Sequence, residues 1–208
     1  MFRPKVRIPD NAPVYPIHDV REIDGQTSKL KMFMPGPDRI PTNNSYINNP
    51  VPGDDNLVVL AIKMECTLRQ IKTATDIDPA KILNNLADAV VEIKSNRGRD
   101  EALKQPIEEF MELSNGVQVS NYHDGINFEQ TIYLPSGKPR HLDNLFAFGP
   151  NGNWDFSVDF HTGDFPAKQK FVDAGYGRFG LKATLYVAEM TDEQLAEYNR
   201  RLEKAANG

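Results

Sequence analysis

Apolar and polar side chains alternate with a period of two residues along three stretches of the chain. This period predicts β-strands, because successive side chains of a strand point to opposite faces of the sheet. The stretches are Leu57–Leu68, Asn153–His161 and Gly180–Met190. Their predicted apolar faces are Val58, Leu60, Ile62, Met64, Cys66 and Leu68; then Trp154, Phe156, Val158 and Phe160; then Leu181, Ala183, Leu185 and Val187.

The aromatic face of the middle stretch predicts two layers of sheet, since three aromatic side chains on one face need an opposing sheet to cover them. We expect them to face Val58, Leu60, Ile62 and Met64 across the core. With the shorter apolar segments included, about six to eight strands separated by turns are expected. The predicted fold class is therefore mainly β, an antiparallel β-sandwich or jelly roll with a few short helices.

Three segments predict helices. Asp78-Pro79 supplies N-cap and first-turn residues for a short helix that continues to Leu86. Pro106 begins a second segment of helical spacing, which continues to Met111. Thr191 and Gln194 match a capping box, and Leu195, Tyr198 and Leu202 then define one face of a C-terminal helix.

The first quarter of the chain differs in composition from the rest. Nine of the fifteen prolines lie in residues 1–53, yet apolar side chains are scattered among them. Because proline disfavours regular structure, we expect an extended arm at 1–53, a body at 54–190 and a C-terminal helix at 191–208. The arm should lie along another surface, which could be its own domain or a neighbouring subunit. The second is the one we expect, so deletion of residues 1–50 should leave a folded body that no longer forms large assemblies. Its contact candidates are Val14, Tyr15, Ile17, Met32, Phe33, Met34, Tyr46 and Ile47.

Composition and charge exclude several classes of protein. The 208 residues are 39% hydrophobic with a net charge of −5, and no dense basic cluster disturbs that balance, so strong nucleic-acid binding is not expected. The longest uncharged apolar run, Leu57–Ile62, is too short for a transmembrane helix. No apolar stretch follows Arg3 and Lys5, so no secretory signal is expected. The only cysteine, Cys66, is expected to be buried and inert.

Candidate chemistry is sparse. His123 and Glu129 resemble part of the first metal-binding motif of cupins, but Gly125 stands where a second histidine would be needed. Asp155 and Asp159 lie four residues apart on one strand face, too far to share one calcium ion. We therefore expect neither a metal, nor a cofactor, nor a catalytic residue.

One glycine-rich segment matches the Gly-x-Gly-x-x-Gly pattern of a nucleotide-binding loop. It is Gly175–Gly180, but it precedes a strand, whereas nucleotide-binding loops follow one. A packing turn is the simpler interpretation. Tyr176 and Phe179 within it are added to the contact candidates, as an alternative in which the turn is exposed.

The overall layout resembles the jelly-roll coat proteins of icosahedral viruses and phages. The matching stretches are the arm Met1–Pro52, the strand Leu57–Leu68, the aromatic strand Asn153–His161 and the closing strand Gly180–Met190. The resemblance implies a structural subunit, not an enzyme, that assembles with copies of itself and with other virion proteins. It also implies location in the virion, after synthesis in the host cytoplasm. Two alternatives stay open: a β-sandwich module that binds sugar or protein, and a cupin-like metalloenzyme.

Overall fold

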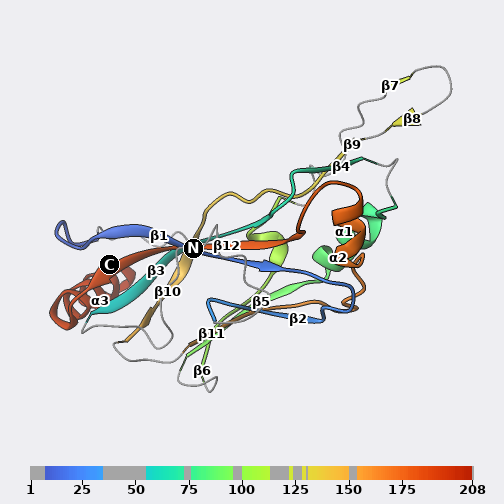
Figure 1. Cartoon of the computed structure of the whole chain (residues 1–208). Coiled ribbons are helices and arrows are strands. Elements are labelled where there is room, and N and C mark those ends of the chain that lie inside the picture. The colour runs from blue at the N-terminus through green and yellow to red at the C-terminus, as the bar shows by residue number, and fades with distance from the viewer. Residues whose placement is uncertain are drawn as a thin grey trace.

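The structure is a computed structural model that describes residues 8–34, 55–72, 76–95, 100–112, 122–123, 128–129, 131–149 and 154–207. It is mainly β, and every strand pairing in the described residues is antiparallel (Figure 1). None of the helices in these ranges is long and apolar enough to span a membrane.

Two four-stranded sheets form the body. The first has the order β1 (Val14–Glu22), β12 (Gly180–Met190), β3 (Asn56–Cys66) and β10 (Arg140–Phe148). The second has the order β2 (Lys29–Met32), β11 (Trp154–Asp159), β5 (Val90–Ser95) and β6 (Asp100–Pro106). Two short ladders lie outside them: β4 (Gln70–Lys72) with β9 (Thr131–Tyr133), and β7 (Tyr122–His123) with β8 (Phe128–Glu129).

The eight strands of the two sheets pair in a nested order. β1 pairs with β12, β2 with β11, β3 with β10 and β5 with β6, so the first strand meets the last and each following strand meets the next one in from the other end. The additional pairs β12–β3 and β11–β5 join these doublets into the two sheets. The chain therefore runs as one long hairpin that is folded over on itself.

The helices lie at the two ends of the body. α1 (Pro79–Ala87) and α2 (Lys168–Asp173) lie at one end, and α3 (Asp192–Asn207) lies at the other (Figure 1). The predicted N-cap of α1 is confirmed, since the side chain of Asp78 accepts from the N–H of Ala80. The segment after Pro106 forms only the short 3-10 helix η3 (Ile107–Glu109).

The core between the sheets is filled by aromatic and aliphatic side chains. Trp154 of β11 stacks on Phe148 of β10 with ring centroids 4.4 Å apart, which joins the two sheets directly. Phe33 contacts Trp154 and Phe156 at 5.2 and 5.6 Å. The prediction that Trp154, Phe156, Val158 and Phe160 share a buried face is confirmed.

The predicted apolar face of β3 is wrong in its first half. Ile62 and Met64 do lie in the core between the sheets, but Val58 and Leu60 lie on the opposite face, beneath α3. The register explains the difference: Tyr186 pairs with Ala61 while the next residue, Val187, pairs with Val59. Leu60 is thus an extra residue, a β-bulge that reverses the alternation.

The predicted boundary near residue 54 is also wrong for the described part of the arm. Residues 14–22 and 29–32 are β1 and β2, an edge strand of each sheet. Pro16 is compatible with β1 because its nitrogen points away from β12. The flanking bonds, from Glu189 N–H to the Pro13 carbonyl and from Ile23 N–H to the Phe179 carbonyl, show that odd-numbered residues of β1 bond to β12.

Deletion of residues 1–34 should therefore unfold the body instead of leaving it intact. It removes two strands and the core side chains of Ile17, Leu30, Met32 and Phe33. At about 1.5–3 kcal/mol for each buried side chain, the loss is comparable with the whole stability of a domain. We expect the truncated chain to lack the cooperative thermal transition of the full-length chain in circular dichroism. A truncated chain with a native transition would contradict the placement of β1 and β2.

Gly137 marks the closest backbone approach outside the sheets. Its segment lies against both β3 and the end of η3, where Met64 N–H donates to the Phe110 carbonyl at 3.1 Å and Cys66 N–H donates to the Pro135 carbonyl at 3.2 Å. A Cβ atom at residue 137 would overlap the carbonyl oxygens of Met64 and Phe110.

Gly137→Ala should consequently lower the free energy of unfolding by about 1–3 kcal/mol, because backbone atoms have to shift to admit the methyl group. The matched control is Gly149→Ala, where the nearest atom, Asn56 Oδ1, lies at an ordinary 3.6 Å. Urea denaturation of both variants measures the difference. Equal stability of the two variants would show that the segment does not lie this close to β3 and η3.

Candidate functional site

The predicted contact residues divide into buried and surface positions. Ile17, Met32, Phe33 and Phe179 lie in the chain's own core, at most 5% exposed, so they have no surface to offer a neighbouring subunit. Phe179 stacks on Phe171 with ring centroids 4.9 Å apart, which makes the segment around it a packing turn. On the surface, Val14 is 53% exposed, and Tyr15, Met34 and Tyr176 are half-buried. Tyr46 and Ile47 lie outside the described residues.

A buried ion pair links the two sheets. Arg21 Nε donates to Asp19 Oδ2 at 2.6 Å, and the backbone N–H of Phe33, just after β2, donates to the same oxygen at 2.5 Å. Asp19 and Arg21 are 0% and 1% exposed, on the face of β1 that also carries Ile17 and Ile23. Phe33 has a φ of 60°, a strained value for a non-glycine residue that the carboxylate helps to hold. The ion pair therefore connects β1 to the end of β2 and stabilises their arrangement.

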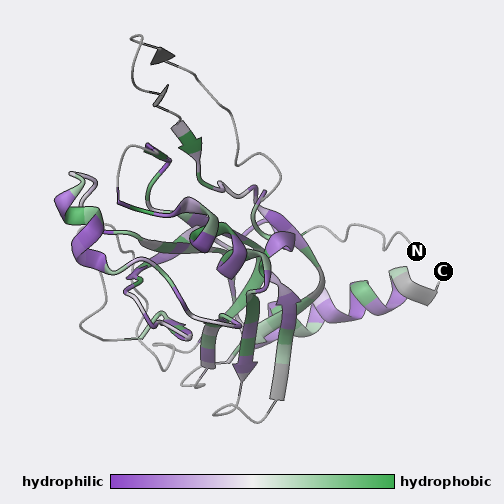
Figure 2. Cartoon of the chain, turned by 90° about the vertical axis from the view of Figure 1, so that its right-hand side faces the viewer, coloured by the Kyte–Doolittle hydropathy of each residue, from purple (hydrophilic) through white to green (hydrophobic). Residues whose placement is uncertain are grey.

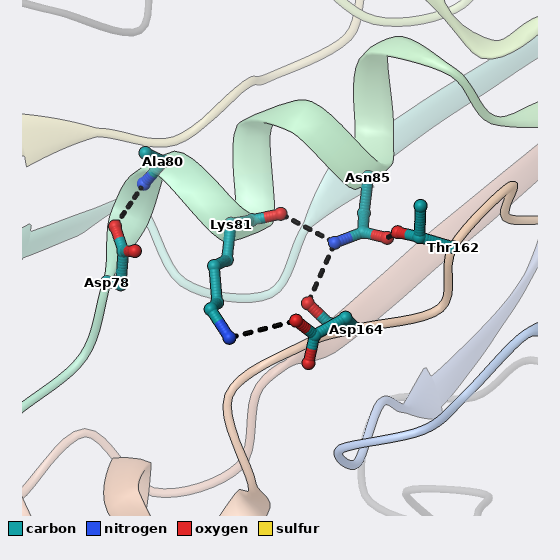
Figure 3. Close-up of polar contacts among 6 residues, drawn as sticks. All are labelled: Asp78, Ala80, Lys81, Asn85, Thr162 and Asp164. Atoms are coloured by element: carbon teal, nitrogen blue, oxygen red, sulfur yellow. Dashed lines mark hydrogen bonds and ion pairs between the residues drawn. The ribbon is translucent and has the colours of Figure 1, made fainter.

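The loop after β11 is fastened to α1 by the side chain of Asn85 (Figure 3). Asn85 Nδ2 donates to the carbonyls of Lys81 and Asp164, at 2.7 and 2.9 Å, and the hydroxyl of Thr162 donates to Asn85 Oδ1. Lys81 Nζ also contacts Asp164 Oδ2 at 2.8 Å, and this hydrogen bond raises the pKa of Lys81. Every polar atom of this amide has a partner within the chain, so the arrangement holds a loop in place.

A shallow hollow of about 460 Å³ lies beside the turn between β1 and β2. Asp24 and Lys168 both line this hollow. Asp24 Oδ1 accepts from the N–H of Lys168 at 2.8 Å and so caps the start of α2. The lining mixes acids and bases. It consists of Glu22, Asp24, Gln26, Thr27, Ser28, Lys29, Leu30 and Lys168. No single charge prevails there, so the hollow does not indicate one class of ligand.

The titratable side chains that the structure describes do not form a reactive group. Cys66 is buried, and this burial raises the pKa of its thiol to about 12, so it is not a nucleophile. Burial, together with the hydrogen bond to Glu189, raises the pKa of Tyr15 to about 12. Among the described residues, no three histidine, cysteine or acidic side chains lie close enough to hold a metal ion.

The outer face of the second sheet is charged. Glu92 lies at its centre, with Lys94 Nζ at 2.9 Å and Lys29 and Lys104 Nζ both at 3.8 Å. The hydrogen bond from Lys94 lowers the pKa of Glu92. Asp155 and Asp159 also pair with lysines of β2, Lys31 and Lys29, at 4.0 and 3.9 Å. The outward orientation predicted for both aspartates is confirmed, and this face, here called the charged face, is wet.

The outer face of the first sheet differs at its two ends. At one end α3 covers apolar side chains: Tyr198 is buried, and Leu195 and Leu202 pack against residues of β3 and β12. Towards the other end Glu65, only 6% exposed, lies within 2.5 Å of Lys63 Nζ and 3.5 Å of Lys182 Nζ. Burial alone would raise the pKa of Glu65, but these lysines and Arg69 outweigh it, so the pKa is lowered.

No protein family matches the sequence, and no curated protein is similar to it. The function must be argued from this geometry. The sequence drew attention to the N-terminal apolar residues but not to the buried Asp19–Arg21 pair or to the charge pattern of α3. The signal for the Asp19–Arg21 pair was two charged residues at strand positions where the alternation calls for apolar ones.

The lowered pKa of Glu65 predicts a pH-dependent contribution to stability. A carboxylate whose pKa is lower in the folded state stabilises that state above its unfolded pKa of about 4.5, and the gain is lost as the pH falls. Glu65→Gln should therefore cost about 1–2 kcal/mol at pH 7 and progressively less below pH 4.5. Urea midpoints between pH 3 and pH 7 measure this, with the exposed Glu203→Gln as control. A cost independent of pH would contradict the role of the Glu65 charge.

Proposed function

We propose that the chain is a jelly roll. Numbered along the chain, the eight strands of the two sheets give the orders 1-8-3-6 and 2-7-4-5. A jelly roll has eight strands in two sheets, and it arises when a long hairpin is wrapped so that its doublets alternate between the layers. The nested pairs β1–β12, β2–β11, β3–β10 and β5–β6 support this topology.

We further propose that the protein is a self-assembling structural subunit, of the coat type found in icosahedral viruses. Jelly rolls occur in viral coats, lectins and cupins, and the filled core argues against a cupin. A cupin binds its metal between the sheets, but here Phe148, Trp154 and Phe156 occupy that space. This filled core is the observation that carries the proposal, because it leaves the outer surfaces as the place for function.

The proposed partner is a second copy of the chain, with other virion proteins as further partners. The proposed location is the virion, after synthesis in the host cytoplasm. With a net charge of −5, the subunit would contact its neighbours and not a packaged genome. Since β1 and β2 belong to the body, the contacts would come from surface residues such as Val14 and not from an arm spanning residues 1–53.

Purified full-length protein should form large, uniform particles above a threshold concentration. Light scattering after size exclusion measures their mass, and electron microscopy shows whether they are closed. Val14→Asp should raise the threshold without changing the thermal transition, because the exposed side chain contacts a neighbour only in the assembly. The matched control is Val172→Asp, at a position that is similarly exposed, 51%, but outside the predicted contacts.

A chain that stays monomeric at every concentration would contradict the proposal. Binding to a glycan array by that monomer would instead support the binding module, and one bound transition metal per chain would support the metalloenzyme.

A further inference from the structure

The charged side chains of α3 follow a regular pattern, and the helix packs on the first sheet without them. Its apolar side, with Leu195, Tyr198 and Leu202, faces the first sheet. Figure 2 shows the helix running outward from the sheets towards the C-terminus. Much of its surface is therefore available to a partner.

Five charged side chains form one stripe along α3, called here the charged stripe. They are Glu193, Glu197, Arg200, Arg201 and Lys204. Their spacing of three or four residues places them on one flank of the helix, away from the apolar side. The side chains of Glu197, Arg200 and Arg201 are 42%, 62% and 51% exposed. The two acids lie in the first half of the stripe and the three bases in the second half.

The stripe is complementary to itself when reversed. If two copies of α3 lie antiparallel about a two-fold axis, Glu193 faces the Lys204 of the second copy and Glu197 faces its Arg200 and Arg201. A two-fold axis repeats each contact, so all five charges meet an opposite charge. A parallel arrangement would place like charges together.

We propose that the charged stripe of α3 docks antiparallel on the charged stripe of a second copy of the chain. This inference rests on the proposed function, because it assigns the two-fold contact of the assembly. Exposed ion pairs are individually weak, so this contact is weak by itself and becomes effective where the assembly repeats it. It is sensitive to salt for the same reason.

The same pattern has a role within a single helix, which the experiment has to separate. Glu197 Oε2 lies 3.0 Å from Arg200 Nη1, and Glu197 Oε1 accepts from Arg201 Nε at 2.9 Å. Acids at the start of a helix and bases at its end also complement the helix dipole. Both effects stabilise α3 without any partner, so association and helix stability must be measured separately.

Three variants test the docking by sedimentation velocity at low salt. The acidic variant carries Arg200→Glu, Arg201→Glu and Lys204→Glu, the basic variant carries Glu193→Lys and Glu197→Lys, and the swapped variant carries all five changes. We expect the acidic and basic variants to self-associate about tenfold or more weakly than the unchanged chain. An equimolar mixture of the two should restore association, and so should the swapped variant, because an antiparallel pair stays complementary when all signs are exchanged.

Glu203→Lys is the control, since residue 203 lies on the other flank of α3 and outside the stripe. It should leave association unchanged. Circular dichroism and thermal unfolding of each variant test the role within the helix. Loss of association in the swapped variant, unchanged association in the acidic and basic variants, or an equal effect of Glu203→Lys would overturn the docking.

The outcomes also separate this inference from the proposed function. Particles that form at an unchanged threshold in the acidic variant would overturn the α3 docking while a coat-type assembly stands. A chain that stops at a stripe-dependent dimer would support the docking and overturn the shell. A chain that is monomeric at every concentration would overturn both.

Discussion

The pairing of the first strand with the last is the constraint on which the fold depends. β1 and β12 meet along an unbroken register, from Val14 opposite Ala188 to Glu22 opposite Gly180. Gly180 has to be glycine because a Cβ atom there would overlap the Arg21 carbonyl oxygen. Once this doublet is closed, β2 and β11 are brought together inside it, and the other doublets follow. Because these contacts are distant in sequence, we expect folding to be slow and to require the whole chain.

The sequence predicted those elements whose signal is local. The aromatic face of β11, the alternation of β12, the Asp78 cap of α1 and the C-terminal helix follow from periods and caps within a few residues. β3 was predicted only in its second half, because the bulge at Leu60 reverses the alternation. A bulge compensates for a register set by the neighbouring strand, and the pattern of one strand does not contain that register.

The N-terminal segment shows where reasoning from composition fails. Prolines argued for an arm, yet Pro16 occupies an edge-strand position that needs no N–H donor. Asp19 and Arg21 lie in the core although both are charged, because they neutralise each other and Asp19 accepts a hydrogen bond from the N–H of Phe33. The partner strand of Pro16, β12, lies far along the chain, and Phe33 comes 14 residues after Asp19, so neither placement follows from local composition. The spacing of the charged residues of the stripe is visible in the sequence. Only the packing of α3 against the first sheet shows that this side of the helix faces outward.

The two outer faces offer different surfaces for association. The charged face of the second sheet carries nearly balanced, already paired charges around Glu92, and burying it against a neighbour would cost the hydration of each of them. One end of the first sheet is instead covered by α3, whose stripe pairs Glu197 with Arg200 and Arg201 within the helix and, in the proposed docking, would also give Glu193 and Lys204 opposite partners. A filled core, a wet second sheet and a self-complementary helix together support the proposed association through the α3 side of the body.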